Sequence, residues 1–314
     1  MALPKHRSKA RVLVVGSCSI DMIVQVDRIP IIGETVIGGR FNSAGGGKGA
    51  NQAVTAARAG ASVEFVGRVG RDDFGKNIIS GLKADGINVS RIEVDPREPS
   101  GIAFIFVGGA GENSIAVASG ANLRLSPRDV AGARGSFSKG TILLVQLETP
   151  LSVVGAAVSL ARRRGMHVIL NPAPARSLPD ALLRKVDIIT PNEHEAESLT
   201  GIKVDGAAAA QAAAKRLHGK GVGTVIITLG SRGAYVSTGA GGSLMPAFKA
   251  KAVDTTAAGD VFNGALAVAL AEGQPLPDAV RFGQAAASIS VTRLGAQPSA
   301  PTRAEIDRLL ARNA

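Results

Sequence analysis

Short β-branched runs alternate along the chain with longer helical segments, and this alternation constrains the fold more than any other feature. The runs have the composition of buried strands and lie at residues 11–16, 63–66, 142–145, 167–170, 186–190 and 225–228. Helical patterns lie between and after them, at residues 51–58, 151–164, 207–218, 264–272 and 277–293. Such alternation is typical of a mainly parallel sheet covered by helices on both faces. We therefore predict a doubly wound α/β fold.

Two stretches break this alternation. Residues 20–41 and 101–117 have strand and turn patterns without a helix, with strands expected at residues 21–26, 33–39 and 102–107. Ligands of open α/β folds bind beyond the carboxyl ends of the strands, so a small sheet projecting near that edge would form a lid. We predict a basic tail over residues 1–10 and a single α/β domain over residues 11–314 that carries this lid.

Composition narrows the class of partner. The 314 residues are 45% hydrophobic and 19% charged, which excludes a disordered chain and allows a large core. The formal charge of +11 admits nucleic acid, an anionic membrane surface or a polyanionic small molecule. With one Tyr, no Trp and nine Phe, and with basic residues spread along the chain, little is available to stack on bases. A small polyanion is the favoured partner.

The cysteine content and the apolar runs indicate a compartment. Cys18 is the single cysteine, so an intrachain disulfide and a cysteine-based zinc site are excluded, and a reducing environment is favoured. The basic N-terminus lacks the apolar stretch of a signal peptide, and no run is long enough to span a membrane. We expect a cytoplasmic protein without a membrane partner.

A glycine-rich segment at residues 43–52 is the first candidate site. It departs from the Walker A loop, because Asn42 stands where that loop has its first Gly and Gly49 where it has Ser or Thr. Consecutive glycines instead allow a small polar ligand to approach the backbone, with Lys48 and Asn51 as hydrogen-bond donors. The alternative is a turn followed by a helix cap.

A second candidate site lies at residues 253–264, where small residues precede an apolar helical run. Unpaired backbone amides and the helix dipole at such a start favour a phosphoryl group. Asp260 lies in this first turn, and the same field would favour its carboxylate form, so it is a candidate acceptor for the proton of a substrate hydroxyl. A capping Asp is the alternative reading.

Three weaker segments complete the pattern. Residues 190–197 place an amide and several carboxylates where a strand gives way to a helix, which suits metal-bound phosphates or an ordinary acidic first turn. Residues 228–233 are a strand followed by a glycine-punctuated turn, and residues 171–176 are a rigid strand exit. None of the three is specific by itself.

Together these segments resemble the ribokinase (PfkB) family of carbohydrate kinases nearly from end to end. The two specific signatures are the Gly46–Asn51 run and the Gly259–Asp260 pair. The resemblance implies a doubly wound core with a β lid, ATP with magnesium, and potassium as a monovalent activator. It implies transfer of the γ-phosphoryl group to the primary hydroxyl of a pentose, with D-ribose favoured and ribose 5-phosphate as product. It also implies a homodimer that pairs through the lid.

The resemblance also assigns roles residue by residue. Asp260 would be the catalytic base, and the anion hole would be the amides of Ala257, Ala258, Gly259 and Asp260. The sugar would be held by Ser19, Asp21, Gly47, Lys48, Asn51 and Glu148. The nucleotide would contact Asn192, Thr228, Gly230, Ser231, Gly233, Gly259 and Gln284. Glu195 would serve magnesium and phosphate, and the monovalent cation would be held by Asp254, Thr256, Ser290, Arg293, Gly295 and Ser299.

One departure bears on the substrate. The family usually has Asn where this chain has Ser19, beside the sugar-binding Asp21. A lost hydrogen bond to a substrate hydroxyl can change discrimination strongly, so another pentose, a deoxysugar or a nucleoside stays an alternative acceptor. A non-catalytic sugar-binding or regulatory protein is the alternative from a different class.

Overall fold

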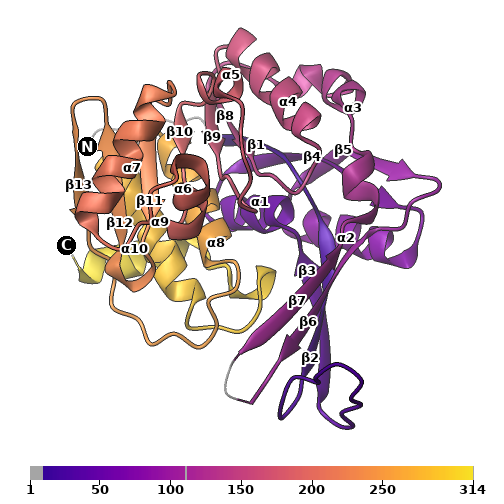
Figure 1. Ribbon diagram of the computed structural model, residues 1–314. Helices are drawn as coiled ribbons and strands as arrows, with labels where there is room; N and C mark the ends of the chain where they lie inside the picture. Colours follow the sequence, from indigo (N-terminus) through magenta and orange to yellow (C-terminus); the bar gives the residue numbers. More distant parts are fainter. Residues whose placement is uncertain (1–9, 110–111, 314) are drawn as a thin grey trace, which may run out of the picture.

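A nine-stranded sheet forms the centre of the computed structural model, which describes residues 10–109 and 112–313 (Figure 1). Its order is β13-β12-β11-β10-β9-β8-β1-β4-β5, and the strands from β11 to β5 run parallel. β12 and β13 extend one edge in the antiparallel sense. The strands are β1 (Arg11–Val15), β4 (Ser62–Gly70), β5 (Asn88–Asp95), β8 (Thr141–Val145), β9 (His167–Leu170), β10 (Ile188–Ile189), β11 (Thr224–Thr228), β12 (Ala234–Thr238) and β13 (Gly241–Met245). The doubly wound, mainly parallel prediction is confirmed.

Helices cover both faces because the central strands are apolar on both sides. In β1, Val12 and Val14 pack on one face and Leu13 and Val15 on the other, and all four are buried. The first face is covered by α1 (Lys48–Arg58), α2 (Asp73–Ala84), α8 (Ala258–Ala271), α9 (Leu276–Ser290) and α10 (Arg303–Arg312). The second is covered by α3 (Pro127–Gly132), α4 (Leu151–Arg163), α5 (Asp180–Leu183), α6 (Glu193–Thr200) and α7 (Ala207–Gly219).

A second, four-stranded sheet projects from the body as the lid (Figure 1). Its order is β3-β2-β6-β7, with β2 (Ser19–Gln25), β3 (Arg40–Gly46), β6 (Gly101–Val107) and β7 (Asn113–Ala118). The predicted strand at residues 33–39 was wrong, because those residues form no strand and the chain enters β3 only at Arg40. The glycine-rich segment therefore begins as a lid strand that runs directly into α1.

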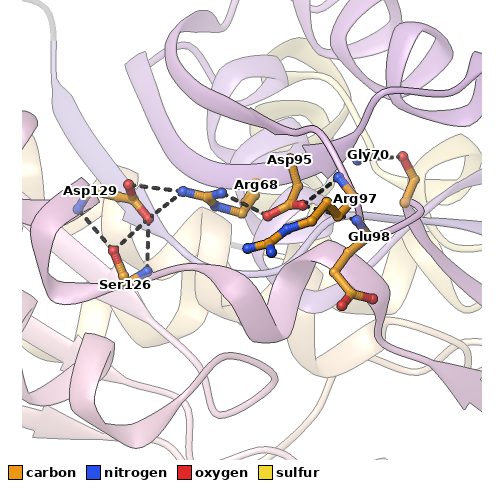
Figure 2. Close-up of polar contacts among 8 residues, drawn as sticks. Arg68, Gly70, Asp95, Arg97, Glu98, Ser126 and Asp129 are labelled. Carbon is orange, nitrogen blue, oxygen red and sulfur yellow. Dashed lines mark hydrogen bonds and ion pairs between the residues drawn. The ribbon is translucent and has the colours of Figure 1, made fainter.

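An ion-pair cluster around Arg68 joins β4, β5 and α3 (Figure 2). The Arg68 guanidinium on β4 pairs with Asp95 at 2.8 Å and with Asp129 at 3.1 Å. Asp95 also accepts the amides of Arg97 and Glu98, and these bonds, helped by Arg68, lower its pKa to about 2 against the effect of burial. Because Asp95 is the last residue of β5 and Asp129 lies in α3, the cluster ties these two elements to β4.

The Asn122 side chain connects the two lid strands β2 and β7 where they meet the body of the protein. The Asn122 side chain accepts the amide of Cys18 at 3.0 Å and donates to the Cys18 carbonyl at 2.8 Å. This ties the exit of β7 to the residue before β2. The predicted tail at residues 1–10 lies outside the described residues except for Ala10, and the predicted turn after β6 falls partly on residues 110 and 111, which also lie outside them. Among the described residues, no helix is long and apolar enough to cross a membrane.

Candidate active site

Asp260 lies buried at the start of α8, between two amide side chains of α1. Its Oδ2 accepts from Asn51 Nδ2 at 3.0 Å and its Oδ1 from Gln52 Nε2 at 2.9 Å. The two helices approach closely because of Gly264: a Cβ there would lie 2.6 Å from the Gln52 carbonyl oxygen. The glycine-rich segment and the Gly259–Asp260 pair, 200 residues apart in sequence, thus form one site.

Burial has the largest effect on the pKa of Asp260. It raises the pKa of the carboxyl above its usual value, against the charge of Lys48 and the hydrogen bonds from Gln52 and Asn51. The helix start was expected to favour the carboxylate form, whereas desolvation of this carboxyl group, which is only 4% exposed, shifts its pKa in the opposite direction. A raised pKa makes Asp260 the stronger proton acceptor once it is ionised.

The backbone before Asp260 presents a small set of amides. Ala257 adopts the left-handed conformation (φ 59°), which turns the chain sharply into α8. The Ala258 amide is already used, because it donates to the Thr255 carbonyl at 3.2 Å. In the described part of the chain, the amides of Ala257, Gly259 and Asp260 have no acceptor. Three of the four amides predicted for the anion hole therefore remain available to a ligand in the described part of the chain.

The lid contributes Asp21, which faces the same site from β2. Its Oδ1 accepts from Ser19 Oγ at 3.3 Å. Burial raises the pKa of Asp21 to about 6; the Ser19 hydrogen bond opposes the shift, and the nearby charges of Glu148 and Asp260 add to it. Gly47 joins lid to helix with φ 85°, where a Cβ would lie 2.7 Å from the Cys18 Cα.

Lys48 is the cation of a site otherwise rich in carboxylates. The negative charge of Asp260 raises the pKa of Lys48, burial opposes this, and Glu148 and Glu195 add to the rise. Glu148 also anchors the start of α1, since its Oε2 accepts the Lys48 amide at 2.9 Å and Ser17 Oγ at 2.5 Å. Glu148, which was predicted to hold the sugar, thus has a structural role.

A cavity of about 590 Å³ opens beside the start of α8. Its walls include all seven residues predicted to contact the nucleotide, namely Asn192, Thr228, Gly230, Ser231, Gly233, Gly259 and Gln284. Sequence reasoning missed others that line it, among them Phe248, Lys249 and Ser288. Phe248 comes from the 246–252 loop, which has no motif, and the Arg281 guanidinium lies 4.6 Å from its ring centroid.

Asn192 and Glu195, predicted separately, bind each other in a capping box at the start of α6. Asn192 Oδ1 accepts the Glu195 amide at 2.8 Å, and Glu195 Oε2 accepts the Asn192 amide at 2.9 Å. Burial raises the pKa of Glu195, although the Asn192 amide and the Lys48 charge oppose this. Glu195 in the acidic first turn therefore caps the start of α6, whether or not it also contacts a ligand.

The residues predicted for a monovalent cation converge on two loops after α9 and before α8. Asp254 holds the loops together, since its oxygens accept the amides of Thr256 and Gly295, each at 2.8 Å. The Arg293 side chain instead pairs with Glu305 at 2.5 Å. Within residues 10–109 and 112–313, no three His, Cys, Asp or Glu side chains group closely enough to hold a metal ion.

Comparison with known proteins identifies the family. The model of the pfkB family of carbohydrate kinases matches residues 9–303. This chain is a member of that family. The ribokinase of Haemophilus influenzae is 48% identical over 292 residues, which cover 93% of this chain and 95% of the relative. The deoxyribokinase of Salmonella typhi is 38% identical, over 96% of this chain and 99% of the relative.

The fold agrees with that membership. The structure of Arabidopsis thaliana ribokinase complexed with ribose and ATP superposes with a TM-score of 0.88 at 34% identity, over 96% of this chain and 99% of that one. The cavity is lined by Ala258 and Gly259, which precede Asp260 in the chain, and Asp21 on the lid strand β2 lies close enough to Asp260 for the charge of Asp260 to raise its pKa. The protein is therefore a carbohydrate kinase that uses ATP.

Sequence reasoning missed the polar residues behind Asp260. Gln52 was seen as part of the glycine-rich segment and Asn171 as part of a strand exit, but neither was assigned to the site. Both are buried, and Gln52 bonds to Asp260 and to Asn171. Both are polar residues among apolar neighbours, and this pattern could have indicated buried side chains with a specific role.

Proposed function

We propose that the protein transfers the γ-phosphoryl group of ATP to the primary 5-hydroxyl of D-ribose, giving ribose 5-phosphate and ADP. The observation that carries the proposal is the buried Asp260 carboxyl group, which lies near Asp21, adjoins the cavity lined by Ala258 and Gly259, and follows amides that have no acceptor in the described part of the chain. Its support from relatives is the ribokinase name of the Haemophilus influenzae protein and the ribose and ATP held by the Arabidopsis thaliana one.

In the proposed reaction, Asp260 accepts the proton of the 5-hydroxyl as that oxygen bonds to the γ-phosphorus and the bond to the β-phosphate oxygen breaks. ADP leaves with the electron pair of the broken bond. The amides of Ala257, Gly259 and Asp260 donate to the oxygens of the transferring group. Asp21 accepts from ring hydroxyls, and Asn51 holds the Asp260 carboxylate through the hydrogen bond from its Nδ2.

Two cations fit the residues present. Magnesium needs only one or two carboxylates besides the nucleotide phosphates, so Glu195, close to Lys48 and Asp260, suffices as the acidic side chain. The bound ion would neutralise charge on the phosphates. Potassium suits the oxygens of the loop that holds Asp254 and Thr256 and of the segment that runs from Ser290, the last residue of α9, through Gly295 to Ser299. There it would steady the backbone that leads to Ala257.

A deoxypentose is the second candidate acceptor. Ser19 replaces the family's usual Asn beside Asp21 and already donates to that carboxylate. The Salmonella typhi relative is named a deoxyribokinase. If the shorter Ser19 side chain does not reach a ribose hydroxyl, ribose loses part of its advantage over the deoxy sugar.

The test is a panel of pentoses, deoxypentoses and nucleosides in a coupled ADP assay, run with and without potassium. We expect D-ribose to give the highest kcat/KM and potassium to raise turnover. Fast turnover of 2-deoxy-D-ribose with slow turnover of D-ribose would move the assignment to the second candidate. Absence of ADP formation with every acceptor would contradict kinase activity.

We also propose a cytoplasmic homodimer paired through the lid. The lid exposes large apolar side chains that a single copy leaves in water, with Phe41 63%, Ile115 52% and Val117 58% exposed. We expect Val117→Lys to shift the protein from dimer to monomer in sedimentation analysis. A monomeric wild-type protein would contradict the proposal, and Val94→Lys, at an apolar position on β5 outside the lid, is the control.

The pKa of Asp21 predicts how sugar binding depends on pH. Below about pH 6 the carboxyl becomes protonated and loses acceptor capacity, so the KM for the sugar should rise as the pH falls through that value. Ser19→Ala removes a hydrogen bond that lowers this pKa, so it should move the rise to higher pH. Sugar KM values on both sides of pH 6 at saturating ATP measure this, and a KM that does not change with pH would refute it.

A further inference from the structure

A closed ring of buried polar groups links Asp260 to the ends of β9 and β10. Gln52 donates from Nε2 to Asp260 at 2.9 Å and to Asn171 Oδ1 at 3.1 Å. Asn171 Nδ2 donates to the Thr190 carbonyl at 3.2 Å, and Thr190 Oγ1 donates to Asn263 Oδ1 at 2.7 Å. Asn263 Nδ2 returns to the carbonyl of Gly259, next to Asp260, at 2.8 Å.

The ring joins the carboxyl ends of several strands to the two helices of the site. Asn171 follows β9 and Thr190 follows β10, while Gln52 lies on α1 and Asn263 on α8. Each of these four side chains is at most 5% exposed. Gln52 is fully buried, so it does not touch a sugar or a nucleotide, and its polar atoms act only on protein groups.

Gln146 fixes which way the Gln52 amide faces. Gln146 Nε2, just after β8, donates to Gln52 Oε1 at 2.5 Å. Because that oxygen is occupied, the two hydrogens of Gln52 Nε2 must point to Asp260 and Asn171, and the amide cannot flip without losing three bonds. Gly16 leaves the space, since a Cβ there would lie 2.1 Å from Gln146 Oε1.

We propose that Gln52 is the positioning residue of the catalytic base: locked by Gln146 and Asn171, it holds the Asp260 carboxylate with Oδ1 occupied by a donor. The inference rests on the proposed function, in which Asp260 accepts the hydroxyl proton. A fixed donor on Oδ1 stabilises the ionised form in a buried site and fixes the rotation of the carboxylate. A flipped Gln52 would instead face Asp260 with an oxygen and repel the carboxylate.

Gln52→Leu tests the proposal. We expect kcat for the sugar reaction to fall by about 10- to 100-fold, because the base is no longer held in position. The acid limb of the kcat profile should move up by about one pH unit, because the ionised form has lost a charge-assisted hydrogen bond. The KM values for ATP and sugar should stay within about twofold, because Gln52 touches neither. An unmoved acid limb in a folded variant would overturn the proposal.

Gln146→Leu is the second variant, and it keeps the proposal testable if Gln52→Leu does not fold. It leaves Gln52 in place but frees its oxygen to turn toward Asp260, so we expect the same direction of shift in the acid limb. A profile like that of the wild type would overturn the proposed lock. Thr149→Val is the matched control, since the buried Thr149 hydroxyl has no partner in the described part of the chain, and its profile should be unchanged.

A direct titration separates this inference from the proposed function. Carbon NMR of the labelled Asp260 carboxyl, assigned by its absence in Asp260→Asn, reports the pKa without turnover. If the wild-type protein phosphorylates no acceptor, the proposed function fails, but a higher Asp260 pKa in Gln52→Leu still supports the lock. If the wild type is active and the Asp260 pKa is the same in both proteins, only the inference fails.

Discussion

Asp260→Asn is expected to lower kcat for sugar phosphorylation by about 10²- to 10⁴-fold, the usual contribution of a general base. Asn has nearly the same shape but cannot take a proton at neutral pH. The KM for ATP should stay within about twofold, because the nucleotide cavity is lined by Asn192, Thr228 and other residues that the substitution leaves in place. Steady-state kinetics with ribose and ATP, each varied at saturating levels of the other, measure both quantities.

The control for this substitution is Asp73→Asn. Asp73 lies at the start of α2 and is 88% exposed in its side chain, so the same change of charge there should leave kcat unchanged. If Asp260→Asn kept a kcat close to that of the wild type, Asp260 would not be the base. A loss in both variants would point to a charge effect instead.

Lys48→Met is expected to lower kcat/KM by about 10²- to 10³-fold, comparable to the loss of one preorganised electrostatic group. Lys48 is the cation that opposes the effect of burial on Asp260, and Asp260 in turn gives the largest contribution to the raised pKa of Lys48. Without it, the carboxylates of Asp260, Glu148 and Glu195 face one another uncompensated. The acid limb of the kcat profile should therefore move to higher pH, because less of Asp260 is ionised at a given pH.

Lys48→Arg separates charge from shape. The guanidinium keeps the positive charge in a larger planar group, so we expect kcat to fall while the acid limb stays near its wild-type position. A full pH profile of kcat for the two variants makes the comparison. If the acid limb of Lys48→Met coincided with that of the wild type, Lys48 would not control the ionisation of Asp260.

The central strands could be predicted because their burial is visible in the local sequence. β1, β8, β9 and β11 are buried on both faces, so they are continuous apolar runs. β3 has no apolar run, because its sequence Arg-Phe-Asn-Ser-Ala-Gly-Gly is polar and glycine-rich. It is a strand because it pairs along its whole length with β2, across the loop of residues 26–39.

The same distinction holds for the site. Asp260 and Lys48 lie in compact motifs and were predicted from them, whereas the residues expected to contact the nucleotide were assigned through the family resemblance. Gln146 and Asn171 act only through Gln52, and no local pattern predicts that the ends of β8 and β9 meet α1. The direction of the Asp260 pKa also required the structure, because burial is set by the packing of α1 on α8.

Phosphorus NMR of the product formed from D-ribose and ATP tests whether Asp260 catalyses phosphorylation of the 5-hydroxyl. We expect one new phosphomonoester, coupled to the protons on carbon 5 of the sugar, that appears together with ADP in the wild-type reaction and is nearly absent with Asp260→Asn. Inorganic phosphate as the sole product, a phosphate on another sugar oxygen, or an undiminished signal from Asp260→Asn would contradict it.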